Sequence, residues 1–595
     1  MSFNQYYQSE LSALRQLGQR FAERNPALAP FLGQAGRDPD VERLLEGVAF
    51  LTGRLRQKLD DELPELSHSL MQLLWPNYMR PLPSFGILQF DPLQRAGPAL
   101  QVERDTPVES KPIKEVICRF RTCYPTEVLS LDLTGLGYSV KGNGSLLSLR
   151  LQMTCDGHLG ELQLNRLRLH LTGERYISQM LYLNLMRNLE HVQLIPLGGD
   201  GGPVTAANGD PLTFRIAASQ VRPVGFADEH ALVPYPLNTF RGYRYLQEYF
   251  AFQEKFLFID VNGLDVLNTL PQDILKQMRG LDLRFDIGKS GNQQLRPTLD
   301  NVKLYCTPIV NLFKHDAQPI RLDGKQDEYL LLPARYDPEH CGVFSVESVT
   351  GWNPGGLGYQ AYVPFESFEH DSSFDVPGNR GYYSVRQRPS LLHGGFDTCL
   401  GFGIRPNPTQ ETLSIELMCT NRNLPRQLNP GDINQPGDKS PASLGFRNIG
   451  PVTPSYAPPL DRDFLWKLIS NMSLNYLSLV DVNALKVILE TYDFPRYHDE
   501  QTEKVSKLLL SGLKAIEHHH VDRLHHGLPV RGICTELTID PQGYIGEGDL
   551  YVFASVLNEF FALYASLNSY HQLRVNSTQG EVYQWTPRMG QQPLL

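Results

Sequence analysis

The residues most able to do chemistry are five histidines within nine positions, from His518 to His526. Imidazole nitrogens bind zinc, nickel and copper, so such a cluster could hold a transition metal. In an extended segment, however, consecutive side chains point to opposite faces. A specific zinc site also needs ligands that converge from separate elements, and no other segment has spacing that supplies them. We therefore predict a polar strand edge or loop that faces solvent, with metal binding only as a fortuitous property.

The known motifs of nucleotide-binding and hydrolytic enzymes are incomplete or absent in this sequence. Gly288-Lys289-Ser290 resembles the end of a phosphate loop, but Leu283 stands where that loop needs glycine. The sequence has neither a GxSxG nucleophile elbow nor an HExxH zinc motif. Asp60-Asp61-Glu62 lacks a histidine or further carboxylate at helical spacing to complete a metal site. We predict no catalytic, cofactor-binding or metal-binding residue, and no enzymatic activity.

The composition is that of a folded, turn-rich protein. Of the 595 residues, 41% are hydrophobic, which is enough for several packed cores and excludes a wholly disordered chain. The 49 glycines and 43 prolines exceed average usage and favour an architecture of many strands and turns. The net charge of −10 argues against a general nucleic-acid-binding protein, whose binding domain is usually basic.

Cysteine usage and apolar patterning favour the cytosol. The first residues have no basic segment followed by an apolar one, so no secretory signal is visible. The eight cysteines are scattered and form no CxxC pair, which predicts free thiols. The longest apolar stretch, Leu550–Leu567, is interrupted by Asn558 and Glu559. A polar pair is costly inside a bilayer, so we predict a buried helix rather than a membrane span.

The elements expected before residue 425 are helices first and strands afterwards. Apolar residues recur at steps of three and four from Tyr7 to Phe21 and again from Val41 to Leu59, which predicts a helical module over residues 1–83. The period then changes to two, most clearly over Leu281–Ile287, where one buried and one wet face are expected. We predict two β-rich parts, sandwich-like or α+β, over residues 84–220 and 221–424.

The remainder divides into a connector and a last domain. Eight prolines and little periodicity over residues 425–459 predict an extended connector. An α+β domain over residues 460–595 follows, ending in an apolar helix at Leu550–Leu567. Its other expected elements are helices over Phe464–Met472, Val482–Tyr492 (capped by Asp481) and Glu503–Ile516, and a strand over Cys534–Ile539.

Several segments, in order along the whole chain, resemble the TssF family, a baseplate subunit of the bacterial type VI secretion system. No single segment is decisive, and the histidine-rich stretch departs from the family pattern. The segments that carry the resemblance include Tyr6–Leu11, Asp38–Leu51, Lys58–Pro64, Leu74–Tyr78, Val310–Phe313, Cys419–Pro425, Leu465–Ser470, Gly546–Gly548 and Phe560–Ser569.

The resemblance implies a structural role in an assembly similar to the wedges of contractile phage baseplates. In the family, two TssF copies and one TssG form a wedge, six wedges surround the spike, and the wedge binds TssK and TssE. The expected partners are therefore TssG, a second TssF copy, TssK, TssE, the spike and the sheath, with the membrane complex contacted indirectly. The resemblance implies the bacterial cytoplasm, docked at the inner-membrane secretion complex, with no nucleic acid, no cofactor and no direct membrane insertion.

Two apolar helical stripes are the natural candidates for partner contacts, because permanent assemblies bury large apolar interfaces. The candidate residues are Tyr7, Leu11, Leu14 and Phe21 at the start of the chain, and Val556, Phe560, Phe561 and Tyr564 near its end. The alternative is that both stripes pack within their own domains. The proline-rich connector could in turn act as a joint that lets two copies adopt different shapes.

Two rival functions stay open at this stage. One is a cytosolic β-sandwich carbohydrate-active enzyme or binding module, since sandwich folds host both kinds of protein. Such an enzyme needs two carboxylates about 5–9.5 Å apart, and no sequence cluster indicates them. The other is a free-standing metal-binding protein that uses His518–His526.

Overall fold

The computed structural model describes most of the chain after residue 74 and short pieces before it. The chain divides into two compact units, residues 1–79 with 460–466 and residues 80–459 with 467–595. The described residues are 7–8, 11–12, 14, 40, 43–52, 54, 71–72 and 75–590, except 143, 207–208, 237–238, 290–294, 323–325, 327, 354–357, 366–380, 391–394, 403–410, 439, 442–443, 461–480 and 526–527.

In the smaller unit, the described residues of both predicted stripes are helical. These are residues 7–8, 11–12 and 14 in the first stripe, and residues 40, 43–52 and 54 in the second. A short helix, α4 (Pro76–Met79), follows and buries Tyr78 and Met79. The expected helix over Phe464–Met472 lies outside the described residues.

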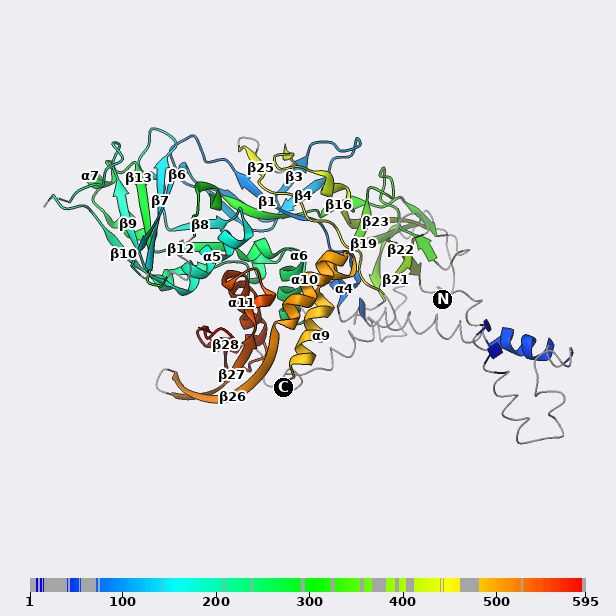
Figure 1. Cartoon of the computed structure of the whole chain (residues 1–595). Coiled ribbons are helices and arrows are strands. Elements are labelled where there is room, and N and C mark those ends of the chain that lie inside the picture. Colours follow the sequence, from blue (N-terminus) through cyan, green and yellow to red (C-terminus); the bar gives the residue numbers. More distant parts are fainter. Residues whose placement is uncertain are drawn as a thin grey trace. The chain divides into compact units, whose positions relative to one another are not determined.

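A six-stranded sheet joins three distant parts of the larger unit (Figure 1). Its order is β24-β3-β4-β15-β1-β25, so β1 lies between β15 and β25. The six strands are β1 (Phe85–Phe90), β3 (Pro107–Ser110), β4 (Arg119–Thr122), β15 (Cys306–Val310), β24 (Ile433–Pro436) and β25 (Phe446–Asn448).

This sheet corrects the prediction of an extended connector over residues 425–459. Strands β24 and β25 lie within that segment and form the two edges of the sheet. Ile433 and Phe446 are buried, which anchors both short strands. Pro436 is the last residue of an edge strand, where the missing N–H costs no ladder bond. The segment is therefore bound into the fold along much of its length.

Two further sheets with a helix between them make up the next part. The five-stranded sheet has the order β10-β9-β13-β7-β6 and the four-stranded sheet the order β11-β12-β8-β14, while β2 (Leu100–Val102) pairs with β5 (Thr126–Val128). Both larger sheets span the boundary predicted at residue 220. The strands are β6 (Leu131–Lys141), β7 (Gly144–Met153), β8 (Arg166–Leu171), β9 (Leu189–Leu197), β10 (Phe214–Ala217), β11 (Val221–Pro223), β12 (Phe258–Asn262), β13 (Gly280–Ile287) and β14 (Val302–Leu304), and the helix is α5 (Arg175–Arg187).

The alternating segment Leu281–Ile287 forms β13, as predicted, but its charged face is not uniformly wet. Asp282 is buried and accepts a hydrogen bond of 2.9 Å from Arg284 Nε. Strand β13 lies between β7 and β9 in the middle of its sheet, and along its polar face Arg284 and Asp286 are only half-buried while Asp282 is buried. The alternating pattern therefore predicted the strand correctly, but the prediction that its polar face is exposed was wrong.

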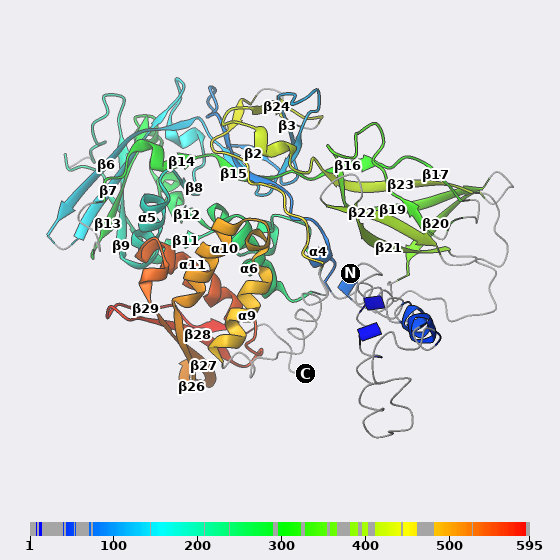
Figure 2. The ribbon, with the colours of Figure 1, turned by 45° about the vertical axis from the view of Figure 1, so that its right-hand side comes forward.

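A separate eight-stranded sheet is inserted between β15 and β24, and we call it the inserted barrel (Figure 2). Main-chain bridging between Ala317 and Pro333 joins its two ends. Leu400, Leu413 and Leu417 lie at the centre of its apolar core. The strands are β16 (Phe313–Asp316), β17 (Ile320–Leu322), β18 (Glu328–Leu330), β19 (Gly342–Asn353), β20 (Gly358–Pro364), β21 (Gly381–Pro389), β22 (Phe396–Phe402) and β23 (Glu411–Thr420).

Two asparagines lock the neck where the chain enters and leaves this barrel. Asn311 Nδ2 donates to Asn421 Oδ1 at 2.8 Å, and the Asn421 main-chain N–H donates to Asn311 Oδ1 at 2.6 Å. The same Asn421 oxygen accepts from the Arg119 N–H at 3.1 Å, which ties the neck to β4. Both asparagines are fully buried. The two chain segments that form the neck lie within Val310–Phe313 and Cys419–Pro425, two of the segments that carry the family resemblance.

The neck predicts a large effect of one substitution. Asn421→Ala removes the acceptor of two buried donors, on Asn311 and Arg119. An unsatisfied buried donor costs about 1–3 kcal/mol. We expect the free energy of unfolding to fall by about 2–4 kcal/mol, measured by urea denaturation. The control Asn423→Ala, at an exposed neighbouring position, should change it by less than about 1 kcal/mol. Equal effects of the two substitutions would contradict this role for the neck.

The C-terminal part packs three helices against a mixed sheet of order β26-β27-β28-β29, with β30 also paired to β28. Asp481 caps α9 through the Asn483 N–H at 3.1 Å, as predicted. The next helix ends at Ser511, and Ile516 lies in β26 instead. These elements are α9 (Val482–Tyr492), α10 (Glu500–Ser511), β26 (Leu513–His525), β27 (Leu528–Ile539), α11 (Glu547–Ala562), β28 (Tyr570–Ser577), β29 (Val582–Gln584) and β30 (Arg588–Met589).

Helix α11 is the apolar helix expected near the end, but three strands follow it, so the domain does not end in a helix. Its neighbours are α5, β28 and α6 (Arg241–Ala251). The Cα of Gly548 lies so close to α5 that an added Cβ would stand 2.5 Å from the Gln179 main chain. The polar residue Glu559 is also accommodated, because its carboxylate pairs with Arg588 at 2.7 Å.

The burial of α11 predicts opposite effects at two apolar positions. Phe560 is 0% exposed and packs against Phe240 and Tyr243, whereas Leu567 beyond the helix is 52% exposed. Burying an unpaired carboxylate is very unfavourable. We expect Phe560→Asp to leave the chain insoluble and Leu567→Asp to leave it soluble, measured by expression and centrifugation. A soluble, normally melting Phe560→Asp variant would contradict the packing described here.

Candidate partner interface

The structure places the candidate residues of the first stripe in partly covered positions. Leu11 is buried, and Tyr7 and Leu14 are half-buried. Phe21 lies outside the described residues. Whether these side chains contact a partner stays a prediction.

The candidates on α11 lie inside the chain's own fold. Val556, Phe560 and Phe561 have no exposed surface, so they offer a partner no area in this structure. Tyr564, just after the helix, is half-buried and contacts Phe240, with the ring centres 4.6 Å apart and the ring planes tilted by 52°. This stripe thus packs within its own domain, which was the alternative to a partner contact. Helical periodicity indicates that a face is covered, but it does not indicate which element covers it.

Exposed apolar side chains lie elsewhere, at positions that were not chosen from the sequence. In the smaller unit, the helical residues 43–52 expose Leu44, Val48 and Leu51, the first and last at 70% and 69%. Their spacing was visible in the second predicted stripe, but a stripe alone does not distinguish an inward from an outward face. Large exposed apolar residues that share one helix face are typical of interaction sites.

The inserted barrel carries a second exposed group, which is aromatic. Trp352 on β19 and Tyr359 on β20 are directly opposite in the strand register. Both are exposed, Tyr359 at 80%, and Phe365 just after β20 is exposed as well. Trp and Tyr are enriched among the residues that dominate interface energies. No sequence signal singled this pair out, because only the register brings the two side chains together.

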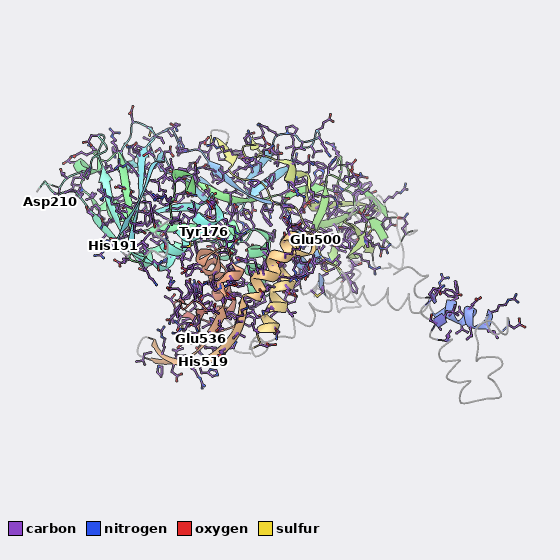
Figure 3. The ribbon with its side chains drawn as sticks, viewed as in Figure 1. Tyr176, His191, Asp210, Glu500, His519 and Glu536 are labelled. Atoms are coloured by element: carbon purple, nitrogen blue, oxygen red, sulfur yellow. The ribbon has the colours of Figure 1, made fainter. Side chains whose placement is uncertain are left out.

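The described part of the histidine-rich segment, residues 518–525, lies in β26 at the edge of the C-terminal sheet, as predicted (Figure 3). His519 and His520 are exposed, whereas His518 contacts the Thr535 hydroxyl at 3.0 Å. The same hydroxyl contacts buried His571 at 2.8 Å. A hydroxyl has one proton, so it donates to one ring and accepts from the other. Within the described residues, no group of three or more His, Cys, Asp or Glu side chains is placed to hold a metal ion.

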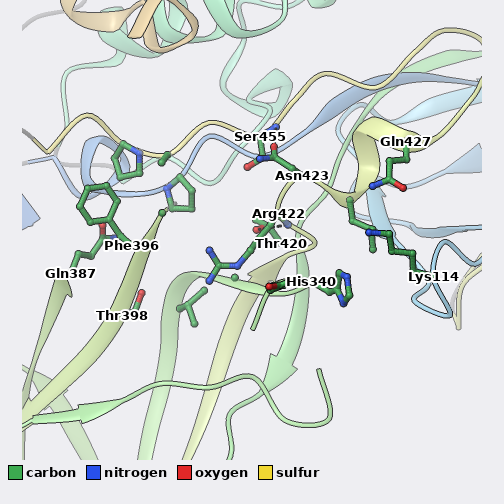
Figure 4. Close-up of a pocket in the computed structure, with 18 residues that line it drawn as sticks. Lys114, His340, Gln387, Phe396, Thr398, Thr420, Arg422, Asn423, Gln427 and Ser455 are labelled. Carbon is green, nitrogen blue, oxygen red and sulfur yellow. Dashed lines mark hydrogen bonds between the residues drawn. The ribbon is translucent and has the colours of Figure 1, made fainter. Parts of the chain in front are cut away.

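A cavity of about 370 Å³ with polar and apolar walls lies at the neck of the inserted barrel (Figure 4). Arg422 lines it and donates from Nε to the Cys341 carbonyl at 3.2 Å. Glu339 is the carboxylate among its lining residues, which also include Lys114 and His340. Paired-carboxylate hydrolysis needs two acids across a cleft, and this lining provides one.

Other predictions about side-chain chemistry can be compared with the structure directly. All eight cysteines are free, as expected. Burial raises the pKa of the Cys118 and Cys123 thiols to about 12, so both stay protonated near neutral pH. Within the part of the chain that the structure describes, no helix is long and apolar enough to cross a membrane.

Three buried or half-buried histidines predict the response of the fold to acid. Burial lowers the pKa of His170, His230 and His571 to about 3 each. The unfolded chain therefore binds their protons near pH 6.5, before the folded chain does, and stability falls as pH drops from about 6.5 towards 3. We expect His571→Gln to reduce this slope by up to about one bound proton, measured by denaturation at several pH values. Substitution of exposed His519 should leave the slope unchanged, and equal slopes in all three proteins would contradict the assignment.

Comparison with known proteins matches these features to one family over nearly the whole chain. The family described as "Type VI secretion system, TssF" matches residues 1–592. The curated protein "Type VI secretion system component TssF1" of Pseudomonas aeruginosa is 29% identical over 644 residues, covering 99% of each chain.

Two solved structures are similar as well. One chain of a TssK-TssF-TssG baseplate subcomplex, solved by cryo-electron microscopy, has a TM-score of 0.76 and 31% identity, covering 93% of this chain and 99% of its own. A chain of a type VI secretion baseplate complex has a TM-score of 0.62 and 28% identity, covering both chains fully. The match therefore includes the sheets, the inserted barrel and the C-terminal part together. On this evidence the chain belongs to the TssF family and is a baseplate component of the type VI secretion system.

Proposed function

We propose that the chain is a non-enzymatic wedge subunit that joins one TssG in two copies and binds TssK. The observation that carries this proposal is the similarity, over 93% of the chain, to a protein solved within a TssK-TssF-TssG subcomplex. The likeness covers the fold of nearly the whole chain, which supports partners of the same kinds.

The distribution of apolar residues supports a role in assembly. The apolar residues of α11 are buried inside the fold, while Leu44, Leu51, Trp352 and Tyr359 are exposed. Exposed large apolar side chains carry a solubility cost in an isolated protein, and contacts with partner subunits would cover them. We propose the helix over residues 43–52 and the Trp352–Tyr359 pair as partner contacts, alongside half-buried Tyr7 and Leu14.

The wider role follows from the family. We propose that the wedge binds TssE, surrounds the spike, and supports sheath assembly and contraction. It would do so in the bacterial cytoplasm, docked at the inner-membrane secretion complex, with no nucleic acid or cofactor and no direct membrane insertion. The carbohydrate-active alternative is not favoured, because the comparisons point to the baseplate family over the whole chain.

Co-purification tests the proposal. We expect the tagged chain, co-expressed with TssG and TssK from the same bacterium, to elute as one complex with two copies of the chain per TssG, measured by native mass spectrometry. The double variant Leu44→Ser with Leu51→Ser should fold normally and weaken or lose the complex, since it removes exposed apolar area. The control Leu524→Ser, equally exposed on β26, should assemble like the wild type. A folded wild-type chain that stays alone in the presence of both partners would refute the proposal.

A further inference from the structure

The larger unit contains a cavity of about 490 Å³ where four segments meet, and we call it the α10 cavity. Its walls are mostly apolar side chains, among them Leu171, Phe252 and Leu509. The segments are the turn from β8 into α5, the end of α6 with the residues after it, the Pro451–Pro454 stretch, and α10 with the turn before it. Ligand sites in proteins are commonly apolar cavities of this size between packed parts, with a few polar groups that fix orientation.

Three buried polar atoms line this cavity without a hydrogen-bond partner among the described residues. They are Asp493 Oδ2, Ser506 Oγ and Gln179 Oε1. Asp493 and Gln179 are each only 1% exposed, and Ser506 is buried too. The Ser506 hydroxyl lies next to the Asp493 carboxyl and lowers its pKa, as do the main chain and the charge of Arg496, so the Asp493–Ser506 pair acts as one polar group in the cavity. Buried polar atoms are nearly always partnered, so three in one cavity indicate a missing partner.

The chemistry of these atoms selects the kind of partner. Gln179 Nε2 donates to Asp549 Oδ1 at 2.9 Å, which assigns Oε1 as the atom that remains an acceptor. An ionised Asp493 carboxylate is also an acceptor, and the Ser506 hydroxyl can accept as well as donate. The cavity thus offers three acceptors within apolar walls. A group with several donors on an apolar stem satisfies them best, as a guanidinium or a primary ammonium does.

Charges around the cavity favour a cation. Glu254 lines it too, and burial raises the pKa of its carboxyl while nearby Arg175 lowers it. Arg175 is the lining residue of opposite sign, but it lies 3.6 Å from Asp549 and bonds to Gln253, so its charge is already engaged. The residues that line the cavity are therefore net acidic.

We propose that the α10 cavity binds a guanidinium or primary ammonium group carried on an apolar stem. Such a group can come from an arginine or lysine side chain of an assembly partner or from a free alkyl cation. In either case the cation bonds to the Asp493 carboxylate, with Gln179 and Ser506 as further acceptors, while the stem contacts the apolar walls. The first of these sources rests on the proposed function, and the site itself does not.

An ionised Asp493 without such a cation destabilises the fold. Burial raises the pKa of the Asp493 carboxyl to about 6, and the charge of Glu490 adds to the rise, whereas Arg496 and Ser506 lower this pKa. Tyr249 and Tyr456 face the same carboxyl from the other packed segments. At pH 7.5 the carboxylate is ionised, and its neutral isostere should be tolerated better. Asp493→Asn is therefore expected to melt at or above the wild-type temperature, so that a loss of binding in this variant cannot be attributed to unfolding.

Isothermal titration with N-butylguanidinium tests the site, with N-butylurea as the neutral probe of the same shape. We expect the wild-type chain to bind the guanidinium with a Kd of about 1 mM or tighter. N-butylurea to the wild type and N-butylguanidinium to Asp493→Asn should each bind at least about tenfold more weakly, a loss of about 1.4 kcal/mol. The control Glu500→Gln removes an exposed acid from α10, the helix that carries Ser506, and should bind like the wild type. Absent guanidinium binding, equal binding of the two probes, or equal binding to Asp493→Asn would overturn the proposal.

The co-purified complex with TssG and TssK separates the two sources of the cation. If a partner side chain occupies the cavity, N-butylguanidinium should not bind to the complex, and Asp493→Asn should weaken it. If the site takes a free cation, binding to the complex should match the isolated chain, and Asp493→Asn should assemble normally. A wild-type chain that forms no complex would count against the proposed function, and the titration of the isolated chain would still decide the cation site.

Discussion

The pairing of β1 with both β15 and β25 is the constraint on which the rest of the larger unit depends. It brings residues 85–90, 306–310 and 446–448 into one sheet, although more than 350 positions separate the first strand from the last. The segments between these strands, apart from β3, β4 and β24 of the same sheet, leave the sheet and return to it. The Asn311–Asn421 hydrogen bonds fix the neck of the inserted barrel in the same way, because a misplaced chain would leave fully buried donors without acceptors.

The C-terminal part is fixed by α11, which supplies apolar side chains to several neighbours at once. Its ring contacts include Phe553 with Tyr249 of α6 and Tyr551 with Tyr182 of α5. Its polar residues are used within the fold too, since Asp549 accepts hydrogen bonds from both Gln179 and Gln253. We expect a chain with such a core to fold before it meets its partners. The proposed partner contacts are then the exposed side chains, on the helix over residues 43–52 and on the inserted barrel.

Sequence patterns predicted those elements whose signals are local. Strict alternation gave β13, and Asp481 before an apolar run gave the start of α9, because both depend on a few consecutive residues. The edge strands β24 and β25 were missed because strands of four and three residues among prolines carry no measurable period. Helix α10 was predicted to run too far. It ends before Gly512, whose carbonyl accepts a hydrogen bond from the Asp540 N–H, and this contact comes from a segment distant in sequence. The α10 cavity could not be predicted, because its acceptors lie more than 300 positions apart and only the fold brings them together.

Hydrogen–deuterium exchange of the isolated chain and of its complex with TssG and TssK tests the central claim, that the core forms without partners and that partners cover other surfaces. The account predicts slow exchange of the α11 amides in the isolated chain, with little change in the complex, and new protection at residues 43–52. Rapid exchange of α11 in the isolated chain, with protection appearing only in the complex, would contradict it.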